Sequence, residues 1–370
     1  MSLSRTLRLS VGWLTTAVFF AAGPQLLALS SSSVLLVLFS AVLFAVILWS
    51  AFGVVTEADH LAVALGEPRG TLVLTLAIVL IEVALISAAT LNSDQPTLAR
   101  DTMFAVVMIV LNGVVGLGLL LGGLRHGQQR YNWQGASAYL GVIIPLAVIS
   151  FILPDFTTST SVGTLHPAQA VAFSIFTLVL YGVFLTIQTG RHRDFFTVQD
   201  GPGSDAGHGH GSNGHGVMNR SALIKQGIWL IAAILPVVLL SKFLAKFIDI
   251  ALSRLGAPPA LGGLLIATIV LAPEAISALR AVTSNQLQRG LNLCLGASAS
   301  TIGLTVPAVL AISLVTGQHL ILGLSPANMV LLVLTLLLNM LTFSGTRTTL
   351  LEGAMHLMVF FVYVSLIFVG

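Results

Sequence analysis

Long apolar runs separated by short polar segments make up most of the 370-residue chain. Each run is close to the roughly 20 residues that an α-helix needs to cross the hydrocarbon core of a bilayer. The runs are continuous and do not alternate, so they predict helices and argue against an outer-membrane barrel. We predict about eleven transmembrane helices, at residues 11–29, 33–55, 70–91, 102–124, 136–153, 168–189, 223–246, 258–280, 291–315, 320–343 and 350–369.

Composition supports an all-α polytopic membrane protein. Hydrophobic residues make up 56% of the chain and charged residues only 8%, whereas soluble proteins average about 25% charged. Such a chain cannot cover its surface with charge, so its main partner is the lipid bilayer. The single cysteine, Cys294, excludes a disulfide scaffold or a cysteine-built metal cluster. Because HExxH, GxSxG and GxxxxGK[ST] motifs are absent, we expect neither an enzyme nor a bound cofactor.

The sixteen basic residues predict the orientation in the membrane. With the N-terminus inside, twelve of them fall in cytoplasmic segments, and four, namely Arg100, Lys242, Lys246 and Arg254, fall outside. This bias follows the positive-inside rule, so the net charge of +3 gives no reason to expect nucleic-acid binding. We expect a bacterial inner-membrane protein with a cytoplasmic N-terminus and an external C-terminus. Residues 1–29 could instead be a signal peptide, because Arg5 and Arg8 precede an apolar run.

An internal repeat divides the chain. The segment IVLIE, which ends at Glu82, matches VLAPE, which ends at Glu274, with an offset of 192 residues or five predicted helices. An odd number of helices inverts the second copy relative to the first, an arrangement common in secondary transporters. We therefore expect an N-terminal helix (1–32), a first five-helix repeat (33–190), a cytoplasmic linker (191–220) and a second repeat (221–370). The oligomeric state stays open, and a homo-oligomer is one alternative.

The expected linker is rich in glycine and histidine and has no apolar anchor, so it predicts a flexible segment. Its His208, His210 and His215 could bind a transition metal such as zinc, although they form an incomplete ligand set. A solvated linker without a specific role is the other interpretation.

Glu82 and Glu274 are the clear acidic residues within predicted spans. A carboxylate at the bilayer centre costs at least about 2.5 kcal/mol on insertion scales, so each is a functional candidate. Small polar residues share helix faces nearby, and Pro273 frees the carbonyl four residues earlier. The candidate cation and proton ligands are Glu82, Glu274, Thr75, Asn112, Ser298, Ser300, Thr301 and the carbonyl of Ile269. Oxygen ligands suit hard cations, although small polar stripes also pack helices together.

Two further residues carry a weaker signal. Glu352 and His356 stand at i and i+4 on the last predicted span. This spacing places them on one helix face. We interpret them as a local packing or interface pair and keep them as weaker transport candidates.

The segments around both glutamates resemble the two α-repeats of the calcium/cation antiporter superfamily. The resemblance covers roughly residues 66–121 and 262–309, and its most specific strings are LAPEA, GLNL and IGLTVPA. They are most similar to the cation/proton exchanger branch, specifically the bacterial ChaA-type sodium, potassium and calcium/proton antiporters. The resemblance implies that Glu82 and Glu274 are the central cation and proton ligands.

The chain departs from the superfamily pattern beside both glutamates. Many eukaryotic members carry a Gly-Asn pair there, whereas this chain has Ile78 and Val79 in one repeat and Val270 and Leu271 in the other. The lost amide oxygens weaken the case for strong calcium coordination and favour sodium or potassium. We expect a secondary active antiporter that exports Na⁺, K⁺ or Ca²⁺ against H⁺. A transition-metal/proton exporter fed by the linker histidines and a cation channel are the alternatives.

Overall fold

The computed structural model describes residues 3–29, 32–65, 69–93, 95–196, 220–345 and 347–369. Most of the predicted linker, including His208, His210 and His215, lies outside the described residues. The N-terminal helices are α1 (Leu3–Leu29), α2 (Ser33–Leu65), α3 (Arg69–Leu91), α4 (Leu98–Met108), α5 (Val115–His126), α6 (Trp133–Ala147) and α7 (Pro167–Thr186). The C-terminal helices are α8 (Arg220–Leu255), α9 (Ala260–Thr283), α10 (Leu287–Ser300), α11 (Val306–Thr316), α12 (Pro326–Thr342) and α13 (Leu350–Val369).

Short segments of other helix types extend or join these helices. The π-helices η1 (Ile109–Val114) and η6 (Thr301–Thr305) join α4 to α5 and α10 to α11, so each pair forms one long rod. The remaining short helices are η2 (Val148–Ile152), η3 (Leu153–Phe156), η4 (Ile187–Arg191) and η5 (Arg193–Phe196). The strands β1 (Gln129–Arg130) and β2 (Arg347–Thr348) pair antiparallel, with Gln129 opposite Thr348.

The predicted all-α polytopic fold is confirmed. Within the described residues, nine helical rods are long and apolar enough to cross a membrane. Two shorter apolar helices, Thr75–Leu91 and Pro326–Thr342, coincide with the other predicted spans. Each of the eleven predicted spans therefore corresponds to a helical rod.

Several predicted boundaries are wrong. The first helix begins at Leu3, eight residues before its predicted start, and α8 continues to Leu255, nine residues beyond its predicted end. The second helix continues to Leu65, ten residues beyond its predicted end, so Glu57 lies inside it and is only 5% exposed. The helix α12 begins at Pro326, directly after its N-cap residue Ser325, so residues 320–325 of the predicted span are not helical. This non-helical stretch uses its amides elsewhere: Leu322 N donates to Gly163 O at 2.8 Å, and Leu324 N donates to Phe151 O at 3.0 Å.

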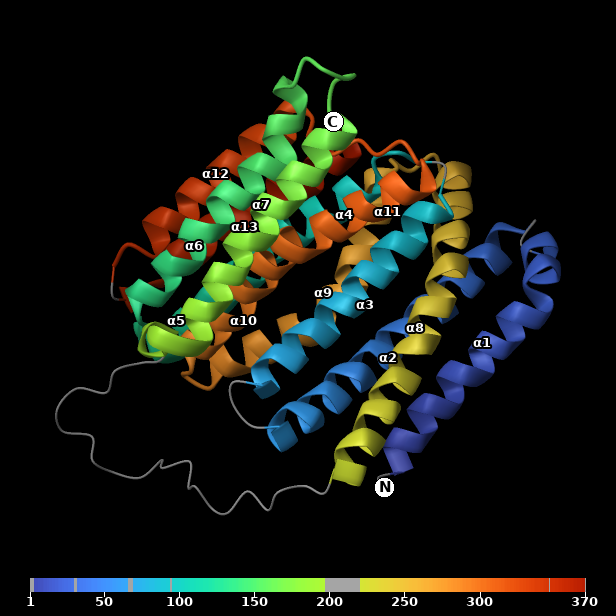
Figure 1. Cartoon of the computed structure of the whole chain (residues 1–370), viewed down its shortest axis with the longest axis horizontal. Helices are drawn as coiled ribbons and strands as arrows, with labels where there is room; N and C mark the ends of the chain where they lie inside the picture. The colour runs from blue at the N-terminus through green and yellow to red at the C-terminus, as the bar shows by residue number, and fades with distance from the viewer. Residues whose placement is uncertain are drawn as a thin grey trace.

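The helices form a layer and a bundle, with α3 and α9 between them (Figure 1). The layer consists of α1, α2 and α8, which pack against one another. The bundle contains α4 to α7 and α10 to α13 and has a hydrophobic core of its own. The helix α3 packs chiefly on α2 and α8, whereas α9 packs chiefly on α4, α5 and α10. The repeat-related helices α3 and α9 therefore have different main neighbours, although α9 contributes side chains to both hydrophobic cores.

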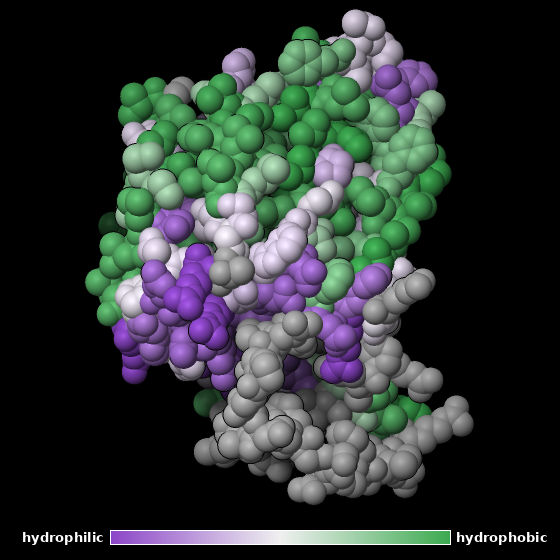
Figure 2. Space-filling view, turned by 90° about the vertical axis from the view of Figure 1, so that its left-hand side faces the viewer, coloured by the Kyte–Doolittle hydropathy of each residue, from purple (hydrophilic) through white to green (hydrophobic). Residues whose placement is uncertain are grey.

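Polar connections gather at two ends of the molecule. At one end, β1 pairs with β2, and Gln129 Nε2 donates to Val282 O at 2.9 Å, which joins three inter-helix connections. At the other end, the 320–325 stretch bonds to Pro96, Phe151 and Gly163. The ends of the chain lie on opposite sides of the molecule (Figure 1). Figure 2 shows a mostly hydrophobic face with hydrophilic residues gathered towards one end, as expected for a chain surrounded by lipid.

Candidate functional site

Two carboxylates occupy corresponding helices between the layer and the bundle. Glu82 projects from α3 and is 3% exposed, and Glu274 projects from α9 and is half-buried. The two side chains interact electrostatically, although they lie 192 residues apart in the sequence. The structure thus brings together the two acidic residues that the repeat singles out. The helix α3 packs chiefly on the layer and α9 chiefly on the bundle, so the two carboxylates come from helices with different main neighbours.

The end of α10 and the π-helix η6 supply hydroxyls beside Glu82. The side chains of Thr301 and Thr305 interact with the Glu82 carboxylate. The Thr301 hydroxyl also donates to Ala297 O at 2.9 Å. Residues 294, 298, 301 and 305 follow helical spacing, so their side chains lie on one face of this rod. The hydroxyl face predicted from the sequence therefore lies against the α3 carboxylate.

A tyrosine from α7 completes this side of the site, and we did not predict it from the sequence. Tyr181 is 3% exposed, lies near Ser300 and interacts electrostatically with both Glu82 and Glu274. Its ring packs on Gly303, where an added Cβ would lie 2.8 Å from the Tyr181 ring. Gly303 therefore allows the aromatic ring to approach the π-helix closely.

Both long rods carry their π-helix at a corresponding place in the two halves. The segments 109–114 and 301–305 are offset by about the same number of residues as the glutamates. The ring of Phe360 packs on Gly113 of the first π-helix, just as the ring of Tyr181 packs on Gly303 of the second. π-helical segments often occur at functional sites, because the extra residue per turn frees backbone groups and redirects side chains. The helices α7 and α13 occupy corresponding places in the two repeats, and each supplies the aromatic ring that packs on a π-helix glycine. An alignment of these two helices is the sequence signal that points to Tyr181.

Glu274 lines a small, mostly apolar pocket between α9, η1 and α10. The pocket wall includes Cys294, which interacts electrostatically with Glu274, and Val110 and Ala297. One carboxylate therefore faces hydroxyls, and the other faces a pocket with little polar lining. The two halves of the site have different chemistry despite the matching position of their glutamates.

Three buried oxygen atoms in this region, Glu82 Oε1, Ser298 Oγ and Thr305 Oγ1, make no hydrogen bond of ordinary geometry within the described residues, although Thr305 lies close to the Glu82 carboxylate. A buried polar atom without a partner costs about 1–3 kcal/mol. Oxygens of carboxylate and hydroxyl type are the ligands that hard cations prefer. The described residues contain no cluster of three or more His, Cys, Asp or Glu, so the oxygen set beside the carboxylates is the donor set available here. It fits a transported cation or proton.

Two predicted ligands lie on the glutamate helices themselves. Thr75 is half-buried and stands seven residues before Glu82, about 10 Å along the helix axis. Ile269 is fully buried on α9. Pro273 lies inside α9 and has no amide hydrogen, so the Ile269 carbonyl lacks its usual helical donor.

The predicted ligand Asn112 belongs to a separate buried network. Its Nδ2 donates to Thr335 Oγ1 at 2.8 Å, and its Oδ1 lies 3.2 Å from His356 Nδ1. His356 Nε2 lies 3.0 Å from Thr342 Oγ1, so both ring nitrogens are engaged. Its neighbour Glu352 accepts a hydrogen bond from Thr349 N at 2.8 Å at the start of α13. The side chain of Asn112 thus links η1 to α12 and α13.

Within the described residues, eleven helical rods hold two carboxylates between a helix layer and a helix bundle, an arrangement typical of membrane transporters. The sequence model of the sodium/calcium exchanger protein family matches residues 34–190 and 225–369. The chain belongs to this family. Each matched segment contains one of the two glutamates, and α1 precedes the first matched segment.

Individual relatives agree with the family. The sodium-potassium/proton antiporter ChaA of Escherichia coli is 40% identical over 323 residues, which cover 87% of this chain and 86% of ChaA. The protein y4hA of Sinorhizobium fredii is 40% identical over 341 residues, which cover 91% of this chain and 90% of y4hA. Among solved structures, YfkE has a TM-score of 0.70 at 17% identity and covers 99% of this chain and 100% of its own. This last likeness shows the fold.

Proposed function

We propose that the chain is a secondary active antiporter that exports Na⁺, K⁺ or Ca²⁺ in exchange for H⁺. The observation that carries the proposal is the meeting of Glu82 and Glu274 beside buried oxygens that lack partners. The 40% identity to a sodium-potassium/proton antiporter supports both the exchange and the monovalent cations. The cytoplasmic N-terminus and the bacterial inner membrane remain part of this proposal.

The mechanism is a competition between cations and protons for one pair of carboxylates. Two ionised carboxylates in a low-dielectric site repel each other and are costly to leave unpaired. A bound cation compensates their charge, and in its absence protons neutralise them. The site therefore holds either a cation or protons whenever its access changes. The helices around it expose it alternately to the two sides of the membrane.

The residues beside the glutamates favour monovalent cations. Val79, Val270 and Leu271 are buried and apolar, so they add no oxygen to the site. Ca²⁺ takes six to eight oxygen ligands, which a site with few side-chain oxygens supplies poorly. We expect transport of Na⁺ or K⁺ to be more efficient than transport of Ca²⁺.

Proton movement in proteoliposomes tests the antiport. Vesicles with an acidic lumen and a trapped pH indicator should become alkaline when Na⁺ or K⁺ is added outside. Ca²⁺ should act more weakly, and Zn²⁺ should have no effect. Cation uptake without proton movement would instead identify a channel. A response to Zn²⁺ that disappears on deletion of residues 207–216 would favour a transition-metal exporter.

The glutamate roles have a test of their own. Glu82→Gln and Glu274→Gln keep the side-chain shape but cannot exchange a proton for a cation, so each should lower the proton response at least about a hundredfold, as expected for loss of a charged ligand worth about 3 kcal/mol. Asp59→Asn is the control, because it removes an exposed carboxylate of α2 that is not among the candidate ligands. Cation-dependent proton movement that persists in either site variant would contradict the assignment.

A further inference from the structure

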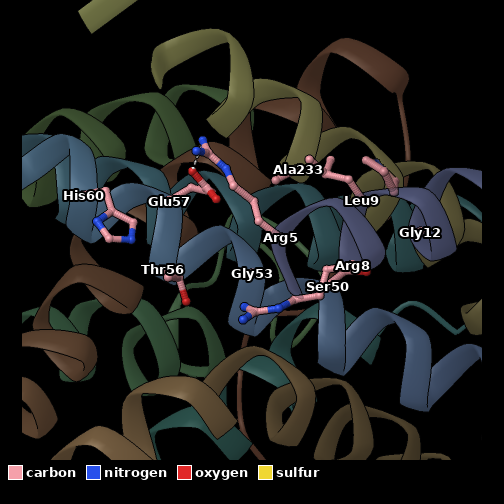
Figure 3. Close-up of a pocket in the computed structure, with 11 residues that line it drawn as sticks. Arg5, Arg8, Leu9, Gly12, Ser50, Gly53, Thr56, Glu57, His60 and Ala233 are labelled. Carbon is pink, nitrogen blue, oxygen red and sulfur yellow. Dashed lines mark hydrogen bonds and ion pairs between the residues drawn. The ribbon is translucent and has the colours of Figure 1, made fainter. Parts of the chain in front are cut away.

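A pocket lies among α1, α2 and α8, on the side of the layer where α1 begins (Figure 3). Its cavity volume is about 60 Å³. Its polar lining consists of Arg5, Arg8, Ser50, Thr56, Glu57 and His60. Glycine, alanine, leucine and proline residues from the same three helices form the rest of the wall. The pocket thus has a charged part and an apolar part.

One of the two arginines is already neutralised. The Arg5 guanidinium forms an ion pair with Glu57, and its carbon lies 4.7 Å from the centre of the Trp229 ring. Gln226 Nε2 donates to the same Glu57 carboxylate at 3.0 Å. These contacts hold Arg5 and Glu57 in place and cancel their charges. They also remove Glu57 as a source of repulsion for an anion.

Arg8 has no acidic partner within the described residues. It is half-buried, and its side chain crosses Gly53 of α2, where an added Cβ would lie 3.5 Å from Arg8 Cδ. Figure 3 shows the Arg8 side chain extended past Gly53, with its guanidinium directed away from Ser50. A half-buried guanidinium without an acidic partner is a suitable ligand for a phosphate oxygen. The pocket therefore carries one uncompensated positive charge.

The surroundings of the pocket are those of a membrane interface. Leu7 and Leu14 on α1 and Ile224 and Ile228 on α8 are exposed, as expected of side chains that face lipid. The Trp13 indole donates to Ala232 O at 3.0 Å and ties α1 to α8. Tryptophan is enriched where membrane and water meet, and basic pockets between spanning helices can bind lipid head groups.

We infer that this pocket binds the phosphodiester of an anionic phospholipid, with Arg8 as its charged ligand. A phosphodiester carries one negative charge, which matches the one uncompensated arginine. The apolar wall accommodates the adjoining glycerol and acyl groups. Such a lipid holds α1 against α2 and α8 at one membrane surface and is independent of the transport site.

Lipid retention by the purified full-length chain tests the inference. Native mass spectrometry after incubation with equal amounts of phosphatidylglycerol and phosphatidylcholine should show preferential binding of phosphatidylglycerol. Arg8→Gln should weaken that binding about tenfold, since a charge-assisted hydrogen bond contributes at least about 1.4 kcal/mol. The control Arg125→Gln removes an exposed basic residue and should leave binding unchanged. Thermal unfolding of both variants in detergent checks that each is folded.

The possible outcomes separate lipid from free phosphate. Retention that millimolar inorganic phosphate leaves unchanged supports the lipid. Displacement by inorganic phosphate with the same dependence on Arg8 supports the phosphate chemistry and assigns it to a soluble ligand. Equal binding of the two lipids by the unaltered chain, unchanged binding in Arg8→Gln, or an equal loss in Arg125→Gln would overturn the inference.

Discussion

A carboxylate inside a membrane needs a compensating partner at every moment, and its neighbours decide which partner it takes. Glu82 has hydroxyls and a tyrosine beside it, whereas Glu274 faces a mostly apolar pocket. Hydroxyls can stabilise an ionised carboxylate by donating to it, and an apolar wall cannot. We expect the two glutamates to contribute unequally to cation binding, with Glu82 the stronger ligand.

Tyr181 offers a test of this inequality. Tyr181→Phe removes a hydroxyl from the Ser300 side of the site and leaves the ring on Gly303. A hydroxyl that stabilises the loaded site by about 0.5–1.5 kcal/mol, as one hydrogen bond does, should raise the KM for the cation between about twofold and tenfold when it is removed. The KM from proton flux at several Na⁺ concentrations provides the measurement.

Tyr139→Phe is the matched control for that experiment. Tyr139 is also buried, but its hydroxyl accepts from Gln188 Nε2 at 2.6 Å. Its KM should stay close to that of the unaltered chain. An equal rise in both variants would mean that the effect is structural, and it would contradict a role for Tyr181 in the site.

At this scale, the sequence indicates charged positions better than it indicates their partners. Glu82 and Glu274 are evident because a charge in an apolar run is costly and both occur at repeat positions. Tyr181 gives no such signal, because tyrosine is common in apolar helices. Asn112 is recognisably polar, yet its partner His356 lies 244 residues further along the chain. Long-range partners of this kind depend on packing, which hydropathy does not describe.

Close helix contacts depend on glycine at the element scale. The α5 and α13 helices approach so closely at Gly116 and Gly353 that a Cβ on Gly353 would lie 2.5 Å from Leu120 N. Backbone atoms cannot move aside as a flexible side chain can. This contact holds α13, and with it His356, against the rod that contains Asn112.

Gly353→Ala should therefore destabilise the folded protein by about 1–3 kcal/mol, the usual cost of overpacking. Gly141→Ala is the control, since nothing lies within 4 Å of the added Cβ. The midpoint of thermal unfolding in detergent should fall for the first variant and stay constant or rise for the second. Equal midpoints would show that α13 can shift without cost.

A tyrosine joins two inter-helix connections at one end. Tyr131 Oη donates to Gly345 O at 2.7 Å, and burial together with the nearby Glu352 charge raises the pKa of Tyr131 to about 12. The neutral hydroxyl is favoured in the folded protein, so its contribution to stability should be fully present below pH 10 and lost as the pH rises towards 12. Tyr131→Phe should cost about 1 kcal/mol at pH 7. Unfolding midpoints of both proteins at pH 7 and 11 should converge at the higher pH.

Element boundaries show where hydropathy fails. All eleven rods could be predicted, because a spanning helix must be long and apolar. The stretch 320–325 is equally apolar, yet its amides bond to other connections, so it is not helical. The π-helices differ from α-helices by one residue in a turn, and an apolar run contains no signal for that difference.

The whole molecule has two polar ends, and the basic residues distinguish them. Arg125, Arg130, Arg280, Arg289 and Arg347 lie at or near the end that contains β1 and β2, whereas Arg100 lies near the other. By the positive-inside rule the first end should face the cytoplasm. This grouping supports the proposed orientation, since loops distant in the sequence share each end.

Cysteine labelling of intact cells tests the orientation. In a Cys294→Ala background, Thr158→Cys places an exposed thiol at the expected outer end, and Ser284→Cys places one at the expected inner end. A membrane-impermeant maleimide should label the first in intact cells and the second only after permeabilisation. The opposite pattern would reverse the orientation of the chain.

The different main neighbours of α3 and α9 have a consequence for the rate of transport. Glu82 lies on a helix that packs chiefly on the layer, and Glu274 lies on a helix that packs chiefly on the bundle, so a movement of the layer against the bundle would change the distance between the carboxylates. A cation bound between the carboxylates would therefore stabilise one relative position of the layer and the bundle, whereas neutral protonated carboxyl groups would not. The free energy of cation binding would then add to the barrier for the movement. A variant that binds its cation too tightly should therefore transport it slowly.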